Sequence, residues 1–253
     1  MANTRSLTLH LPAQWLALGI SKASQAQVQI QDARGTLWNG SGKLVFTGGP
    51  GSRDALALPG RIQWQLGVTA FGPGPLQFDA AVFAPCCMAT PSRTNLLAIQ
   101  GLQGLQLKVA DHRSEWPADL LSGLGAPWNT LQAEGNLMLE TQQLQILFSQ
   151  NQMQFQGELK LTAQNINSKL STLRPMGTYQ VKLGADAANP TSPRLTLSTL
   201  SGSLLLSGQG QWQGAHFQFR GEASAVPEHA AALSNLLNII GRRQGARSLL
   251  SLG

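Results

Sequence analysis

The sequence predicts an all-β protein with mainly antiparallel strands. Apolar and polar residues alternate in many short segments, Asn-Gly and Pro-Gly pairs separate several of them, and few stretches have the spacing of an amphipathic helix. We expect a long curved sheet, or an open barrel or sandwich, with two or three short helices including one near the C-terminus. Two similar β-rich halves, residues 1–110 and 111–253, would form one continuous structural unit.

The composition limits the classes of function. Of the 253 residues, 42% are hydrophobic, enough for a sizeable core, and only 12% are charged, roughly half the usual share. The net charge of +6 comes without a long basic run, since the tightest group is Arg242, Arg243 and Arg247. A nucleic-acid surface would show denser Lys and Arg, so a solvated tail or contact with an anionic membrane fits better. No stretch reaches the roughly 18 consecutive apolar residues of a transmembrane helix.

The first half begins with strand signals. Val28 and Ile30 alternate with glutamines, as expected of a strand with one buried face. Two short strands over residues 34–38 and 41–46 should be hinged at Asn39-Gly40, because this pair tolerates the positive φ angles of tight hairpins.

A stretch rich in Pro and Gly, residues 72–91, predicts an irregular loop with one strand at 76–83. It contains the two cysteines of the chain, Cys86 and Cys87, which are adjacent. Alone they can form neither a zinc site nor a CxxC motif. A vicinal disulfide, in an oxidising compartment, and two partly buried thiols both stay open.

The second half has the clearer pattern. Strands over residues 135–140, 144–148 and 153–163 should form a meander. In the last strand, six residues point the same way: Met153, Phe155, Gly157, Leu159, Leu161 and Ala163.

Two segments of this half resemble each other, Phe155-Gln156-Gly157-Glu158 and Phe219-Arg220-Gly221-Glu222. They suggest a weak internal repeat of roughly 65 residues, although such a pattern can also recur wherever hairpins do. We expect both glycines within strands, where a bulge, a bend or a crossing aromatic needs the missing side chain.

Helices are predicted over residues 12–23, 116–121 and 227–240. In the last of these, Pro227 suits the first turn, Glu228 opposes the N-terminal dipole and Gly241 ends the helix. A final strand should follow at residues 248–252.

The C-terminal helix has a second side that is neutral rather than charged. Its apolar stripe is Leu233, Leu236, Leu237 and Ile240, and the other side carries Ala231, Ser234, Asn235 and Asn238. A helix that only covers a sheet usually shows Glu and Lys there, so we expect a second contact, either with the final strand or with a partner. The candidate interface residues are Trp38, Trp64, Asn235, Arg242 and Arg243.

No catalytic, cofactor-binding or metal-binding residue is predicted, so we expect no enzyme. Residues 40–43 resemble the end of a phosphate-binding loop, but Leu44 stands where Ser or Thr is required. The four histidines, His10, His112, His216 and His229, lack metal-ligand spacing, and the 12 acidic residues form no cluster suited to acid–base catalysis.

Three segments together resemble the protein N family of the type II secretion system: residues 32–41, residues 58–64 and the tail over 208–243, which is the most specific. The resemblance implies the periplasmic β-rich domain of a single-pass inner-membrane protein. Such a protein is an accessory component that helps folded proteins cross the outer membrane. Its partners would be other subunits, in the inner-membrane platform or the link to the secretin, and the family's transmembrane helix would precede Leu7.

A second function stays open. The sheet could be a groove that binds lipids or other hydrophobic molecules, as in AsmA-type envelope proteins. A continuous apolar trough open to solvent would favour the groove, whereas a filled core with an exposed strand edge would favour a scaffold.

Overall fold

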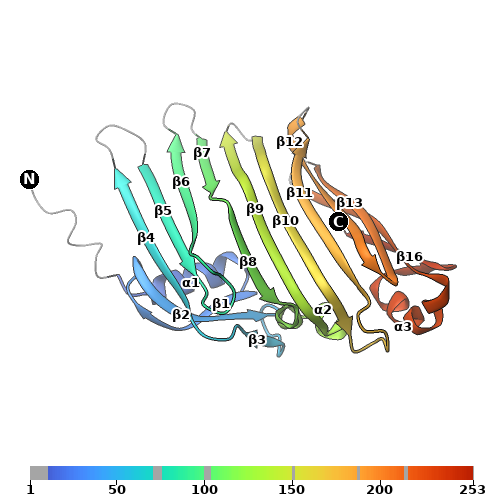
Figure 1. Ribbon diagram of the computed structural model, residues 1–253. Coiled ribbons are helices and arrows are strands. Elements are labelled where there is room, and N and C mark those ends of the chain that lie inside the picture. The colour runs from blue at the N-terminus through green and yellow to red at the C-terminus, as the bar shows by residue number, and fades with distance from the viewer. Residues whose placement is uncertain are drawn as a thin grey trace, which may run out of the picture. The chain divides into compact units, whose positions relative to one another are not determined.

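The computed structural model describes residues 11–70, 76–99, 104–149, 152–186, 189–213 and 216–252 (Figure 1). The chain divides into two compact units. Unit 1 comprises Met1–Val109 and Leu120–Thr130, and unit 2 comprises Ala110–Asp119 and Leu131–Gly253. Strands dominate both units and pair antiparallel, so the predicted all-β antiparallel fold is confirmed.

Unit 1 is an open sheet with one helix at its start. Its elements are α1 (Gln14–Ala23), β1 (Val28–Gly35), β2 (Asn39–Thr47), β3 (Ala55–Ala57), β4 (Ile62–Ala70), β5 (Leu76–Phe83), β6 (Ser92–Ile99) and β7 (Gly104–Val109). The strand order is β1-β2-β4-β5-β6-β7, with β3 paired to β2, so consecutive strands are mostly neighbours.

Glycines in β2 let two large side chains pack flat against the sheet of unit 1. A Cβ at Gly40 would meet the indole of Trp64, and one at Gly42 would meet the side chain of Ile30. Because these positions lack side chains, Trp64 and Ile30 are 3% and 7% exposed and form the core of this unit together with Val45.

The first hairpin turns earlier than predicted. The turn lies at residues 36–38 and not at Asn39-Gly40, which already belong to β2. Gly35 supplies the left-handed conformation with φ +89°, and the Thr36 hydroxyl accepts a hydrogen bond from the Asn39 amide at 3.0 Å. The strand predicted at 76–83 is confirmed as β5.

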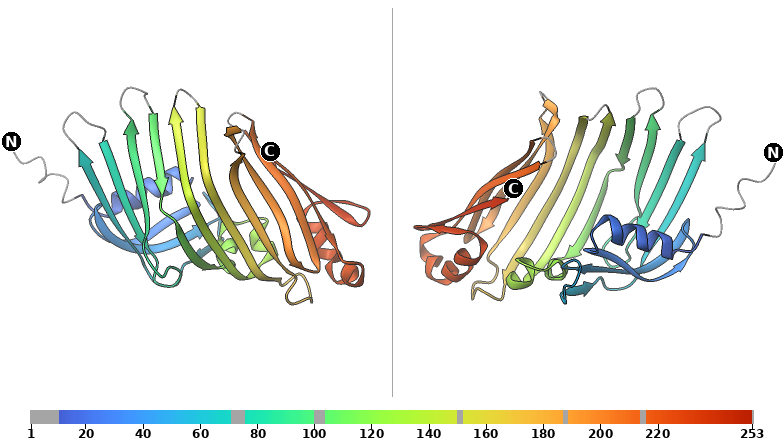
Figure 2. Two further views of the ribbon diagram at one scale, coloured as in Figure 1. Left: turned by 45° about the horizontal axis from the view of Figure 1, so that its top comes forward. Right: turned by 180° about the vertical axis from the view of Figure 1, so that it is seen from behind.

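Unit 2 contains the longest strands. Its elements are β8 (His112–Pro117), β9 (Ala133–Ser149), β10 (Gln152–Ser168), β11 (Gly177–Asp186), β12 (Asn189–Gly202), β13 (Leu204–Gln213), β14 (His216–Ala225), the 3₁₀ turn η2 (Pro227–His229), α3 (Ala230–Ile240), β15 (Arg242–Gln244) and β16 (Arg247–Leu252). The order is β9-β10-β11-β12-β13-β14-β16-β15, with β8 beside β9. Figure 2 shows these long strands from two further sides.

The predicted strands over 135–140 and 144–148 are one strand, β9. A bulge replaces the expected turn, because Gln143 takes φ 47° opposite Gly157 with φ +82°. The extra residue on β9 keeps the apolar side chains on one face before and after the bulge.

The helix predictions are largely confirmed. The segments over 12–23 and 227–240 correspond to α1 and to η2 with α3, and the final strand is β16. The helix predicted over 116–121 is wrong in its start, since Trp116 and Pro117 belong to β8 and the 3₁₀ helix η1 covers Ala118–Leu124. A further short helix, α2, covers Trp128–Leu131. None of the helices in the described ranges is long and apolar enough to cross a bilayer.

The two Phe-x-Gly-Glu segments do not occupy equivalent positions. Both lie in unit 2, Gly157 at a bulge and Gly221 in regular pairing with Gly208. Phe155 is 3% exposed, whereas Phe219 is half-buried. This geometry gives the repeat hypothesis no support, although both glycines lie within strands, as expected.

Candidate interaction surfaces

The two tryptophans proposed for an interface differ in exposure. Trp64 is buried, and its indole N–H donates to the Leu37 carbonyl at 3.1 Å, so its side chain packs within unit 1 and is not carried forward as an interface residue. Trp38 is half-buried beside the same turn, and its carbonyl accepts from the Leu66 amide at 2.7 Å. Trp38 remains a candidate interface residue.

A charged cluster beside this turn was not predicted. Asp32, with φ 51°, accepts from Arg61 at 2.6 Å and from Arg34 at 3.0 Å. The Arg61 guanidinium, and then that of Arg34, hold the pKa of Asp32 below its ordinary value. Arg61 also donates to the Ser41 carbonyl at 3.1 Å, so it joins β1 to β2 at the end of the hairpin.

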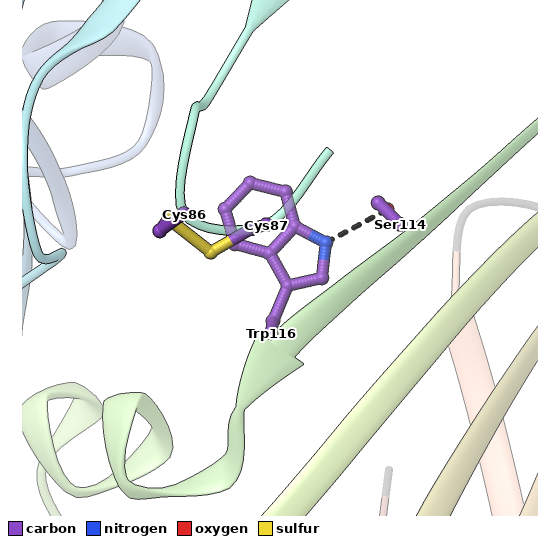
Figure 3. The surroundings of a disulfide bond; sticks show 4 residues. All are labelled: Cys86, Cys87, Ser114 and Trp116. Carbon is purple, nitrogen blue, oxygen red and sulfur yellow. Dashed lines mark hydrogen bonds between the residues drawn. A yellow bond between two sulfur atoms is a disulfide. The ribbon is translucent and has the colours of Figure 1, made fainter. Parts of the chain in front are cut away.

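The structure joins Cys86 and Cys87 in a vicinal disulfide, in the loop that follows β5 (Figure 3). Cys87 is 6% exposed and Cys86 is exposed. The amides of Cys87 and Met88 both donate to the Ala84 carbonyl, at 3.0 and 2.9 Å, which closes the loop into a tight turn. Figure 3 also shows the Trp116 indole N–H donating to the Ser114 hydroxyl at 2.8 Å in β8.

The C-terminal helix α3 packs with one side on unit 2. Leu233, Leu236 and Leu237 are at most 1% exposed, and the Ser248 hydroxyl of β16 donates to the Leu237 carbonyl. The helix lies against β14, β15 and β16 near one end of the strands (Figure 1). Its stripe of leucines therefore covers part of the sheet, as the sequence indicated.

The neutral side of α3 faces solvent. Ser234, Asn235 and Asn238 are exposed, so this side does not pack on the final strand. The expected second contact of this side is therefore with a partner protein and not with the final strand. Arg242 and Arg243 are exposed on β15, next to this side in sequence.

The edge strand of the sheet beside α3 is short and polar. β15 pairs only with residues 247–249 of β16, and Arg247 forms an ion pair with Glu222 at 3.2 Å. Beyond this pairing, β16 continues to Leu252, which is 63% exposed. Short, charged edge strands protect a sheet against uncontrolled pairing.

A continuous apolar face crosses unit 2. Directly paired residues on antiparallel strands share a face, so the register defines two rows of side chains. The first row begins on β10, beside Thr141 of β9, and comprises Leu159, Leu183, Leu195, Gly210, Phe219 and Leu252. The second row is Leu139, Leu161, Val181, Leu197, Gly208, Gly221 and Leu250. We call these two rows the apolar face.

The opposite side of the same strands is polar. Between the two rows, on the other face, lie Glu140, Lys160, Lys182, Thr196, Gln209, Arg220 and Ser251. Glu140 and Lys160 form an ion pair at 2.8 Å there. The charged side chains of this part of unit 2 are thus separated from the apolar face by the sheet itself.

The apolar face is incompletely covered. Every leucine and valine of its two rows is half-buried except Leu252, which is exposed. A core side chain is less than a tenth exposed, as Leu237 of α3 is. Among the described residues of unit 2, no second layer therefore covers most of these two rows, which is unusual because a sheet normally buries its apolar side against another layer.

Several features of the described residues bear on metal binding and catalysis. No three His, Cys, Asp or Glu side chains gather there as a metal site would require. His229 shares a hydrogen bond of 2.7 Å with Ser203, and burial raises the pKa of Tyr179. A depression of about 730 Å³ lies open on the polar face and is lined by Arg194, Arg220 and Glu222 among others. The described lining of this depression contains no histidine and no cysteine.

Alternating apolar and polar residues in the sequence indicate part of the apolar face. Residues 179–183 and 194–197 alternate between apolar and polar side chains, as β11 and β12 now show, but neither strand was predicted. The face as a whole depends on register between strands, which alternation alone does not give.

The comparisons with known proteins identify a family. Residues 26–249 match the family described as Type II secretion system (T2SS), protein N, and so include strands of both units. No curated protein and no solved structure matches significantly. Since the match covers most of its length, the chain belongs to the protein N family of the type II secretion system.

Proposed function

We propose that this chain is a non-enzymatic accessory component of the type II secretion system. It would be the periplasmic domain of a single-pass inner-membrane protein that aids export of folded proteins across the outer membrane. The observation that carries this proposal is the family match over residues 26–249.

The proposed partners are other subunits of the machine, in the inner-membrane platform or among the components that link it to the secretin. The exposed neutral side of α3 with Asn235, and the neighbouring Arg242 and Arg243, form one candidate contact. Trp38 in unit 1 is a second. An interface without acidic side chains, rich in Asn and Arg, suits a partner surface that offers carboxylates or carbonyl oxygens.

Deleting the gene in its host and measuring exoproteins tests this function. We expect folded exoproteins to fall in the medium and accumulate in the periplasm, and plasmid-borne full-length protein to restore them. Normal export by the deletion strain, with the other subunits at normal levels, would contradict the proposal. Reporter fusions to the C-terminus, active only in the periplasm, test the location independently.

A second candidate function is the binding of a hydrophobic molecule, as in envelope proteins of the AsmA type. The observation that favours it is the half-buried apolar face of unit 2, which has no charged side chain in either row. The two functions are compatible, because a secretion component can also bind lipid.

A further inference from the structure

The apolar face of unit 2 is wide. Its first row crosses six neighbouring strands from β10 to β16. At ~4.8 Å between strands, the row is roughly 24 Å long. Half of a ~30 Å bilayer core, about 15 Å, is the length that one acyl chain occupies. One row is therefore longer than the depth that one acyl chain occupies in a membrane.

The chemistry of the face suits hydrocarbon better than protein. A protein–protein interface carries about one hydrogen bond per 100–200 Å² and is enriched in Tyr, Trp and Arg. The two rows contain only Leu, Val, Phe and Gly, so their side chains offer no donor and no acceptor. Their backbone groups are engaged in the ladders between strands. Hydrocarbon chains lose nothing on such a surface, whereas a polar partner would bury unsatisfied groups.

The face is also smooth at its glycine positions. A Cβ at Gly208 would meet the ring of Phe219, and one at Gly210 would meet the ring of Phe217. The rings thus lie across the glycines, and the Trp212 ring packs on Phe217 with centroids 4.6 Å apart. A surface of flat rings lacks the protrusions and depressions into which the side chains of a helix would pack. A flexible chain therefore adapts to it more easily than a helix does.

We propose that the apolar face of unit 2 binds the acyl chains of phospholipids. The chains lie along the leucine rows, and α3 closes the face at one end, where Ser248, the partner of Ala223, donates to the Leu237 carbonyl. The proposal deepens the second candidate function and rests on it. It does not depend on the role in secretion, because lipid capture and exoprotein export are measured separately.

Photolabelling tests the proposal. The chain is incubated with vesicles of phosphatidylethanolamine and phosphatidylglycerol that contain a phosphatidylcholine with a diazirine at the end of one acyl chain. After irradiation, mass spectrometry locates the labelled residues. We expect label on Leu183, Leu195 and Phe219, and at least tenfold less on Lys182 and Thr196 of the polar face.

A matched pair of variants isolates the face. Leu195 and Thr196 are neighbours on β12, both half-buried, with side chains on opposite faces. Leu195→Glu should reduce labelling about tenfold, and Thr196→Glu should leave it within twofold. If Leu195→Glu does not fold, as judged by circular dichroism, Leu195→Gln takes its place with the same expectation.

Three results would overturn the proposal. The first is absence of label above that of an unirradiated sample. The second is label confined to surfaces outside the face, such as the exposed Trp15 and Leu18 of α1, which would indicate adsorption to vesicles. The third is a dimer in sedimentation experiments that Leu195→Glu dissociates, since a second copy would then cover the face.

Discussion

Replacing Leu237 by alanine should destabilise unit 2 strongly. This side chain is 1% exposed and belongs, with Leu233 and Leu236, to the buried stripe of α3. Truncating a buried leucine to alanine typically costs 2–5 kcal/mol, and we expect about 3 kcal/mol here because the helix packs at one end of the sheet and can partly close the cavity. For a chain of 253 residues this corresponds to a decrease in Tm of roughly 6–12 °C.

Thermal and urea unfolding, followed by circular dichroism, measure this change. The matched control is Ile239→Ala on the same helix, where the side chain is 39% exposed and truncation should cost less than about 1 kcal/mol. Equal melting temperatures for Leu237→Ala and the unmodified protein would refute the packing of α3 described above. An equal loss in both variants would show that the helix is not anchored by its leucine stripe.

Three further predictions concern other parts of the chain. Gly157→Val and Gly221→Val should each lower the free energy of unfolding by roughly 1–3 kcal/mol. Gly157 has φ +82°, and a Cβ at Gly221 would approach the Ser207 carbonyl at 2.5 Å. Unchanged urea midpoints in both variants would contradict this prediction. Asp32 should titrate below its ordinary pKa of 3.8, so its ion pairs stabilise the fold above that pH and are lost as pH falls through the lowered pKa; NMR should find the pKa raised in Arg61→Ala but still below its ordinary value, because Arg34 remains paired with Asp32. Asn235→Arg should leave Tm unchanged but impair secretion, and normal export at normal protein levels would remove α3 from the interface.

The sequence was most informative where the signal is local. The helix before Gly241 and the strand after it were predicted because an apolar stripe, a favourable Pro227 and a helix stop lie within a few residues. The alternation over 153–163 likewise predicted the shared face of Phe155, Leu159 and Leu161.

The remaining features depend on contacts between distant residues. The bulge that makes β9 one strand needs Gln143 opposite Gly157, and the position of the first turn depends on Gly35 and Thr36. The burial of Trp64 depends on Gly40 of another strand, whose missing side chain leaves room for the indole. The candidate site was missed for the same reason, since its rows are formed by strand register.

The central claim, membership of a secretion machine, is tested most directly by purification of the full-length protein from envelope extracts. Tagged protein is extracted in mild detergent after cross-linking, and the co-purifying proteins are identified by mass spectrometry against an untagged strain. The account predicts enrichment of other type II secretion subunits, with a decrease for Asn235→Arg at equal recovery of the tagged protein. Recovery of the intact protein without any secretion subunit, from cells that are actively exporting, would contradict it.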